Sequence, residues 1–423
     1  MNEAVADTHN RVFSARAKRI EQVLVVTLGA FALSAFFSQT GINSFGLLSL
    51  LLLLILKMHT RFTRKDYLPR PLVIWTIIML VNMAISAVIV SDNRLRGLVE
   101  LKRQWAIFLG GLLVISPLSD QSRKKIIYVF IAGAVLAGIM GVFQHFGILL
   151  KHVDRSHAFA HPIHYAETLS FSGAIALMLL LIPNDVLPRN RKVTFLLLLT
   201  VLASFTGVLF SLTRGVWISL AAACPLILFL YRPRKALIFT LSALAVLLVI
   251  FVQSKELRTR ATSIYTSLYT EGPYGSTGSR FVLWKASLLM FEGSPLVGEG
   301  VGDFDDDVNK LIAQKEIAPI SVTCHAHNIF FQALATQGLV GLVILCVVLA
   351  QLFRWGMKML KAGRPINGYL ILLVTLLTVL EGLTEYNLGV SKFLAVFMFS
   401  LGLFGGYGVA TPENPIRTEI RRG

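Results

Sequence analysis

The chain has 423 residues and a formal net charge of +17; 55% of its residues are hydrophobic and only 15% are charged. Soluble domains carry about 25% charged residues, and the mean hydropathy of this chain is +0.69. This composition excludes a soluble enzyme, a disordered chain and a disulfide-stapled domain, and it predicts an all-α polytopic membrane protein. The uncharged runs 236–254 and 393–411 are each long enough to cross a bilayer.

Taken in chain order, the apolar runs predict twelve membrane-spanning helices. The predicted spans are residues 22–40, 41–56, 71–91, 104–119, 126–150, 166–183, 193–213, 215–231, 236–254, 328–353, 366–386 and 389–411. Nine spans therefore lie in residues 1–254 and three in residues 328–411. A large loop, 255–327, separates the two groups, and a short tail, 412–423, ends the chain.

The basic residues orient these spans. With the amino terminus in the cytoplasm, the cytoplasmic segments hold 25 Lys and Arg residues and the external segments hold 15. Seven of those 15 lie in the loop 255–327, and long loops are discounted by the positive-inside rule. Both termini are therefore predicted to be cytoplasmic. Because the charges are scattered between spans and form no single face, nucleic acid is not an expected partner.

The external loop 255–327 is long enough to form a subdomain or lid. A glycine-rich stretch, 272–278, precedes helices predicted near 280–291 and 303–316. Asp303 and the acidic residues after it are typical of a helix start. Gly298–Gly302 superficially resembles a nucleotide loop, but no lysine of the phosphate-binding type follows it.

Basic side chains on the predicted external side are exceptions to the charge rule, and their natural partner is an anion. These side chains are Arg94, Arg96, Lys102 and Arg103 in one short loop, Arg214 in a minimal turn, and Arg280 in the large loop. The alternative is that they contact lipid phosphates or pair with Glu381 and Glu385, which lie one turn apart near the external end of the eleventh span.

Histidines gather on the same side. They are His152, His157, His161 and His164 after the fifth span, and His325 and His327 before the tenth. Their irregular spacing is weak evidence for a metal site, and no metal is predicted. The three cysteines, Cys224, Cys324 and Cys346, are too few and too apolar in context for a disulfide framework.

One motif at the tenth span resembles that of the bacterial O-antigen ligases. His327-Asn328 is followed by nine residues and then by Gly338-Leu339-Val340-Gly341. The elements Arg214-Gly215-x-Trp217 and Arg280-x-x-x-Trp284 are similar to the arginine positions of these ligases. The stretch from Pro295 through Gly298 and Gly300 to Phe304 resembles a loop pattern of the wider ligase and polymerase superfamily.

This resemblance implies an integral-membrane glycosyltransferase of the GT-C type at the periplasmic face of a Gram-negative inner membrane. Such an enzyme moves O-antigen from undecaprenyl diphosphate to a terminal sugar of lipid A-core, without a metal or nucleotide cofactor. Its donor and acceptor both lie among membrane lipids.

The resemblance and the chemistry together assign expected roles. His327 is the expected general base, because imidazole takes up a proton near neutral pH. Arg214 and Arg280 are expected to stabilise the leaving diphosphate. The remaining expected contacts with substrate or with these groups are Arg94, Arg96, Lys102, Arg103, His325, Asn328, Trp284, Glu381 and Glu385.

Finer expectations attach to four of these positions and to two glycines. Asn328 is expected to cap the tenth helix or to orient His327. Glu381 and Glu385 are expected to orient the arginines or to contact the acceptor sugar. Trp284 is expected to pack against the isoprenoid chain or to anchor the loop at the membrane interface. Gly338 and Gly341 are expected to permit close helix packing.

Two other functions fit the sequence. An O-antigen polymerase or a protein O-oligosaccharyltransferase uses the same type of donor with another acceptor. A transporter of lipid-linked glycan or of anions places ionisable residues near the bilayer midplane, whereas those of this chain concentrate at the external ends of the spans.

Overall fold

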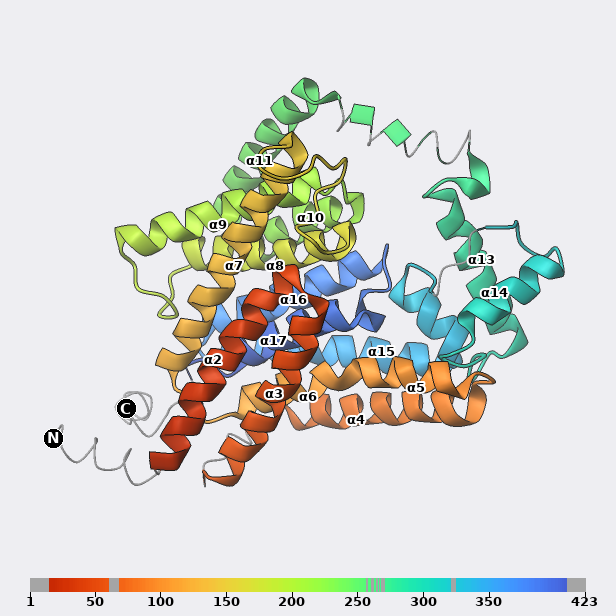
Figure 1. Ribbon diagram of the computed structural model, residues 1–423, viewed down its shortest axis with the longest axis horizontal. Helices are drawn as coiled ribbons and strands as arrows, with labels where there is room; N and C mark the ends of the chain where they lie inside the picture. Colours follow the sequence, from red (N-terminus) through yellow and green to blue (C-terminus); the bar gives the residue numbers. More distant parts are fainter. Residues whose placement is uncertain are drawn as a thin grey trace.

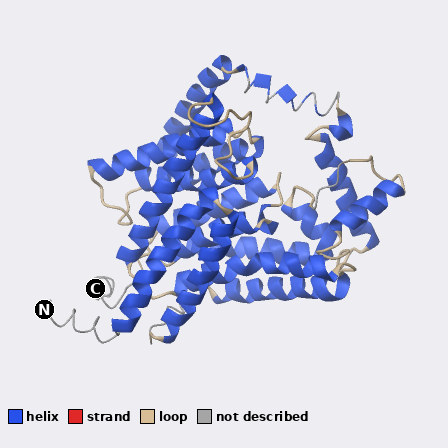
Figure 2. Cartoon of the chain, viewed as in Figure 1, coloured by secondary structure: helices blue, strands red, loops and turns tan. Residues whose placement is uncertain are grey.

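The computed structural model describes residues 15–60, 68–255, 271–320 and 325–408, together with 258, 259, 262, 263, 265 and 267. In this part of the chain every regular element is a helix (Figure 2). The elements, labelled as in Figure 1, are α2 (Ala15–Phe37), α3 (Gln39–Met58), α4 (Arg70–Ile85), the π-helical turn η2 (Ser86–Val90), α5 (Arg94–Lys102), η3 (Arg103–Trp105), α6 (Ala106–Ile115), α7 (Asp120–Phe146), α8 (Pro162–Leu181), α9 (Arg191–Phe210), α10 (Arg214–Tyr231), α11 (Pro233–Gln253), η4 (Gly272–Tyr274), α13 (Gly278–Gly293), α14 (Phe304–Ala313), α15 (Ile329–Lys361), α16 (Pro365–Gly382), η5 (Asn387–Gly389) and α17 (Ser391–Gly405).

Nine helices among the described residues are long and apolar enough to cross a membrane: α2, α3, α4 with η2, α7, α8, α9, α10, α15 and α16. The chain is therefore a multi-pass membrane protein. The fourth predicted span, 104–119, is much shorter than expected. Its α-helical part, α6, has ten residues, because the backbone is extended at Ser116 and Pro117 follows. Helix α17 has 15 residues where a longer span, 389–411, was predicted.

The helix ends fall into two groups. We call the end at which α8, α10, α15 and α17 begin the histidine end. At this end Trp105 Nε1 donates to Ser391 Oγ at 3.2 Å and joins the start of α6 to the start of α17. At the opposite end, Asn367 Nδ2 donates to the Phe404 carbonyl oxygen at 2.6 Å and joins α16 to α17. This grouping of helix ends is the arrangement that alternating membrane crossings require.

A buried arginine at the opposite end holds three helices together. Arg123, near the start of α7, is 0% exposed. Its Nη1 atom donates to the carbonyl oxygens of Gly402 and Leu403, and its Nη2 atom donates to the Leu113 carbonyl oxygen. Because the last carbonyl groups of a helix have no partner within the helix, this side chain caps α6 and α17 together.

We expect Arg123→Ala to destabilise the protein by about 3 kcal/mol, because several buried carbonyl groups lose their donor. The measurement is the midpoint of thermal unfolding in detergent. Lys124→Ala, on the neighbouring and half-buried residue, is the matched control and is expected to leave the midpoint nearly unchanged. Equal midpoints for the two variants would contradict the capping role.

Helix α15 is broken in its first third by Gly338. The backbone there has φ 62° and ψ −160°, which is not helical. The freed N–H groups of Leu339 and Val340 donate to the carbonyl oxygens of Pro295 and Leu296, at 2.9 and 3.2 Å. The segment 295–300 of the large loop thus fits into the break. Gly338 thus permits a close approach, as expected, but the segment that approaches belongs to the large loop and not to another helix.

The large loop packs on the bundle as a small helical subdomain. Figure 1 shows α13 and α14 beside the first part of α15 and beside α5. The helices predicted at 280–291 and 303–316 appear as Gly278–Gly293 and Phe304–Ala313. Asp303 accepts hydrogen bonds from the backbone N–H groups of Asp92 and Asn93, at 2.8 and 2.7 Å. Its carboxylate thereby fastens α14 to the turn before α5.

Candidate functional site

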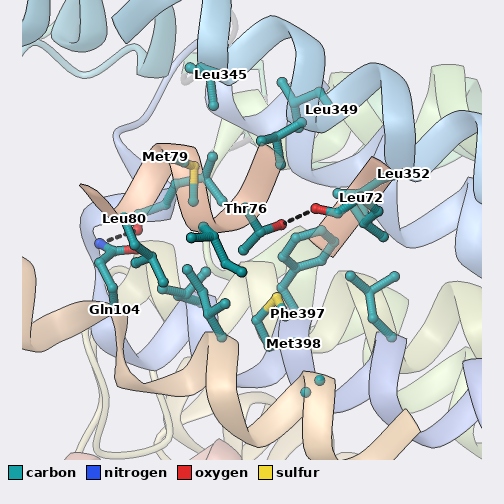
Figure 3. A pocket seen from close by; sticks show the side chains of 18 of the residues that line it. Leu72, Thr76, Met79, Leu80, Gln104, Leu345, Leu349, Leu352, Phe397 and Met398 are labelled. Atoms are coloured by element: carbon teal, nitrogen blue, oxygen red, sulfur yellow. Dashed lines mark hydrogen bonds between the residues drawn. The ribbon is translucent and has the colours of Figure 1, made fainter. Parts of the chain in front are cut away.

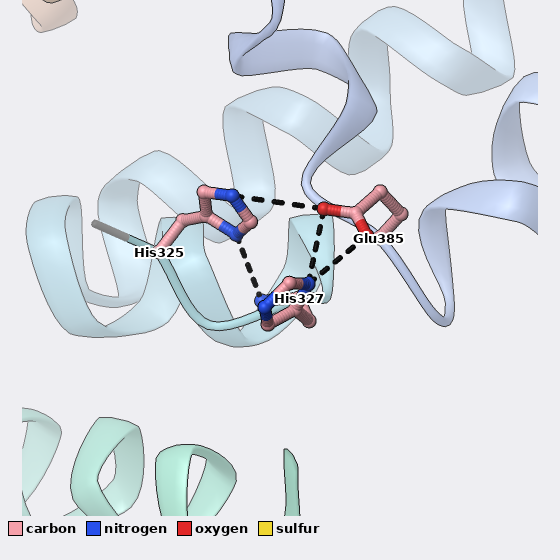
Figure 4. Close-up of side chains that lie close together, drawn as sticks. All are labelled: His325, His327 and Glu385. Carbon is pink, nitrogen blue, oxygen red and sulfur yellow. Dashed lines mark hydrogen bonds and ion pairs between the residues drawn. The ribbon is translucent and has the colours of Figure 1, made fainter. Parts of the chain in front are cut away.

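A histidine and a glutamate form a hydrogen-bonded pair at the histidine end. His327 Nδ1 lies 3.0 Å from Glu385 Oε2 and 3.1 Å from Glu385 Oε1 (Figure 4). The His327 side chain is 20% exposed and that of Glu385 is 6% exposed. Because Nδ1 faces the carboxylate, Nε2 is the ring nitrogen available to a substrate. We call this pair the His327–Glu385 dyad.

Local backbone geometry aims the His327 ring. His327 has φ +50°, a conformation that non-glycine residues seldom adopt. The next residue, Asn328, is the N-cap of α15: its Oδ1 atom accepts from the N–H groups of Phe330 and Phe331, and its Nδ2 atom donates to the Leu383 carbonyl oxygen. The cap thus ties the histidine loop to the segment that carries Glu385. The structure thus gives Asn328 the expected capping role.

The surroundings of Glu385 keep it charged. Burial acts to raise the pKa of this carboxyl group. The hydrogen bond with His327 and the electrostatic attraction of His327, His325 and Arg280 outweigh burial and hold the pKa at about 2. Glu385 is therefore a carboxylate at neutral pH. Burial also lowers the pKa of His325, to about 4, so this second histidine is neutral there.

The two predicted arginines converge on this region from α10 and α13. Arg280 Nη2 lies 4.0 Å from Glu385 Oε2. Arg214 donates to the hydroxyls of Ser276 and Thr277, at 3.3 and 3.2 Å, in the turn just before Arg280. Arg280 thus lies beside the dyad, and Arg214 contacts the turn from which the helix of Arg280 begins.

Trp284 holds the histidine loop in place. Its Nε1 atom donates to the Ala326 carbonyl oxygen at 3.1 Å, and its ring stacks on Phe331 with a centroid distance of 5.2 Å. Ala326 precedes His327, and Phe331 lies in the first turn of α15. This side chain therefore joins α13 to the motif. This contact with the histidine loop is neither of the two roles expected for Trp284 from the sequence.

Glu381 does not reach the arginines. It is 1% exposed, and its Oε1 atom lies 2.6 Å from Ser170 Oγ of α8. The expectation that it orients an arginine or contacts the acceptor is wrong, because one helical turn from Glu385 places it inside the bundle.

The predicted basic cluster forms the amphipathic helix α5 and the turn η3. Arg96 pairs with Asp306 of α14 at 3.1 Å, and Arg103 pairs with Glu100. Arg94 and Lys102 are exposed. The cluster was predicted as a loop, but Asn93 caps a helix there by accepting from the Arg96 N–H group.

Three ligand-type side chains meet at the dyad. His325, His327 and Glu385 each offer one atom, and these atoms lie within 4.8 Å of one another. Histidine nitrogens and carboxylate oxygens are donors that zinc accepts. The Arg280 guanidinium 4.0 Å from Glu385 opposes a second cation at this position.

An apolar cavity of about 370 Å³ opens next to the dyad. Its walls are α4, α6, α15 and α17, with side chains such as Leu72, Leu80 and Leu349 (Figure 3). Ile329 and Tyr386 also line this cavity, and each is within two residues of a dyad residue along the chain. This cavity suits a hydrocarbon chain, because apolar walls gain from excluding water.

One functional candidate escaped the sequence analysis. Glu167 of α8 lies 3.0 Å from His164. The histidine was noted only as one member of an irregular group, and the glutamate was not singled out. A glutamate three residues after a histidine, at the start of a predicted span, was the signal available, since such residues share a helix face.

Two of the three cysteines are described by the structure. Cys224 is buried and Cys346 is exposed, and both are free. Cys324 lies outside the described residues, as does the predicted tail 412–423.

Comparison with known proteins finds similarity over part of the chain. An uncharacterized protein of Haemophilus influenzae is 25% identical over 238 residues; the match covers 54% of this chain and 58% of that protein. The chain thus matches little more than half the length of this relative. The family model described as O-antigen ligase matches residues 198–346, the segment that carries Arg214, Arg280 and His327. Over this segment the chain is similar to the O-antigen ligase family.

Proposed function

We propose that the protein is a GT-C-type glycosyltransferase that moves O-antigen polysaccharide from undecaprenyl diphosphate to a sugar hydroxyl of lipid A-core. The reaction takes place at the periplasmic face of the Gram-negative inner membrane, with both termini in the cytoplasm. The observation that carries the proposal is the His327–Glu385 dyad beside Arg280, within reach of the segment that matches the ligase family.

The proposed reaction is a single displacement. The acceptor hydroxyl oxygen attacks the anomeric carbon while the bond from that carbon to the diphosphate oxygen breaks, which inverts the configuration. His327 Nε2 takes the hydroxyl proton, and the Glu385 carboxylate stabilises the imidazolium that forms. The diphosphate leaves as an anion. Arg214 and Arg280 stabilise its charge by charge-assisted hydrogen bonds, so that no metal cofactor is needed.

The apolar cavity supports a lipid-linked substrate. A cavity walled by α4, α6, α15 and α17 and ending beside the dyad would hold part of a lipid chain. The exposed cations Arg94 and Lys102 on α5 lie on the same side of the bundle, where they would attract anionic head groups, as would the paired Arg96 and Arg103.

The test uses purified protein in EDTA with labelled undecaprenyl-diphosphate glycan, with and without lipid A-core. Label that moves to lipid A-core only when this acceptor is supplied supports a metal-independent ligase. Longer lipid-linked glycans formed without lipid A-core indicate a polymerase, and label on added protein indicates a protein O-oligosaccharyltransferase. No transfer by folded protein favours a transporter.

We expect Arg280→Gln and Arg214→Gln each to lower the transfer rate about 10²–10³-fold, because the leaving diphosphate loses a preorganised donor. Arg354→Gln, on an exposed residue of α15 at the opposite end, is the matched control and should keep the wild-type rate. The measurement is transfer of label under saturating donor. A rate within threefold of wild type for both site variants, a margin of about 0.65 kcal/mol in the barrier, would contradict the assigned role.

A further inference from the structure

A second histidine–glutamate pair lies at the start of α8. His164 Nδ1 is 3.0 Å from Glu167 Oε2, the same two atom types at the same distance as in the His327–Glu385 dyad. The His164 side chain is 23% exposed and that of Glu167 is 1% exposed. The carboxylate therefore faces Nδ1 from inside the bundle, and Nε2 lies toward the accessible side of the ring.

The second pair belongs to the same site as the dyad. His164 interacts electrostatically with Glu385 and with His325. Helix α8 packs directly against α16, which leads into the Glu385 segment. Two imidazoles, each backed by a glutamate, thus face one region at the histidine end.

A buried lysine can act as the counter-ion of Glu167. Lys392 of α17 is 4% exposed and interacts electrostatically with Glu167. A buried ammonium needs a nearby counter-charge, which a Glu167 carboxylate would supply. With Glu167 ionised, the Nδ1–H group of His164 is the donor of the 3.0 Å hydrogen bond.

The His327–Glu385 dyad must lose, before each new turnover, the proton that His327 has taken from the acceptor. The carboxylate that makes His327 a better base also stabilises the imidazolium once the proton has been taken. Loss of that proton must precede the next turnover. A neutral imidazole with its own carboxylate, facing the same region, is suited to receive it.

We propose that His164, oriented by Glu167, is the second proton acceptor of the site. This role rests on the proposed function. After transfer, the Nε2–H bond of the His327 imidazolium breaks, and its proton passes through water to His164 Nε2, where a new N–H bond forms. Glu167 stabilises the His164 imidazolium, which then releases the proton to solvent at its exposed edge. His327 returns to its neutral form.

The test compares the first turnover with steady-state turnover in His164→Gln. His327 removes the first proton without help, so the first turnover should stay within about twofold of wild type. Steady-state turnover should fall about tenfold or more, because each cycle then waits for unaided proton release. Added imidazole, a small proton carrier, should restore the steady-state rate. Glu167→Gln should show the same pattern, and His152→Gln, on an exposed histidine outside both pairs, should match wild type.

Other outcomes overturn the proposal in distinguishable ways. Equal slowing of both phases without rescue by imidazole would mean that His164 only supports the structure. Wild-type rates in both phases would mean that it has no part in proton transfer. If wild-type protein transfers no glycan, the proposed function itself fails, whatever the variants do.

Discussion

His327→Gln protein is expected to transfer glycan about 10²–10⁴-fold more slowly than wild type, because the acceptor hydroxyl loses its general base. Glutamine keeps a polar side chain of similar reach but takes up no proton near neutral pH. The measurement is a single-turnover rate with saturating acceptor, which reports the chemical step. Binding of donor should change little, since the arginines and not His327 are assigned to the diphosphate.

The control for this variant is His325→Gln. His325 Nε2 lies 3.7 Å from Glu385 Oε1, and His325 Nδ1 accepts from the His327 N–H group, so neither ring nitrogen is open to the acceptor hydroxyl. Its replacement is expected to slow transfer much less than that of His327. A His327→Gln rate close to wild type, or a larger effect at His325, would remove His327 from the role of base.

Glu385→Gln tests the partner of the base and its pH dependence. The pKa of Glu385 is lowered from 4.5 to about 2, so its charge stabilises the fold fully above pH 4.5 and is lost as the pH falls through about 2. As the pH falls from 4.5 to about 2, the free energy of unfolding should therefore decrease less for the variant than for wild type. A cationic imidazole is also less favourable without the carboxylate, so the acidic limb of the rate profile should move to lower pH. The unfolding midpoint and the glycan-transfer rate, each measured against pH for both proteins, check these two expected shifts.

Gly338→Ala is expected to destabilise the protein on the order of 3 kcal/mol, through backbone strain and overpacking together. An alanine Cβ atom at this position would lie 2.4 Å from the carbonyl carbon and oxygen of Leu296. The φ of +62° is also unfavourable for any residue with a side chain. The backbone atoms of Leu296 cannot rotate away, so either the break in α15 or the segment 295–300 must shift.

The measurement for Gly338→Ala is the midpoint of thermal unfolding in detergent, together with the transfer rate. Gly111→Ala is the matched control: an alanine Cβ atom there would have no neighbouring atom within 4 Å, and the residue lies inside α6. Alanine there should leave stability equal or raise it by about 0.5–1 kcal/mol. Similar behaviour of the two variants would show that the break in α15 tolerates a side chain.

The two glycine-containing motifs form one structural unit. The N–H groups of Glu299 and Gly300 donate to the carbonyl oxygens of Ala335 and Thr336, at 3.0 and 3.1 Å, on the other side of the break from the bonds that Leu339 and Val340 make. The backbone groups freed at Gly338 thus find partners in the segment 295–300. An unsatisfied backbone group inside a membrane protein is costly, and this pairing explains why a helix of 33 residues can break there.

Hydropathy and charge determined a large part of this protein. The membrane-spanning helices, the large loop between α11 and α15, and the helices within that loop follow from runs of apolar side chains and from glycine and acidic residues near the helix ends. Arg214, Arg280 and His327 also stood out, because each lies in a short motif or breaks the charge rule locally. Such signals are carried by neighbouring residues, so one sequence is enough to find them.

The tertiary structure alone decided the pairings. Glu385 meets His327 from 58 positions along the chain, whereas Glu381, one turn earlier, turns into the bundle toward Ser170. Lys392 comes from α17 to balance Glu167, and Leu296 occupies the break that Gly338 makes. A hydrogen bond or a steric contact depends on distances of a few ångströms between separate helices. Hydropathy predicts that those helices form, but only their packing determines which side chains come into contact.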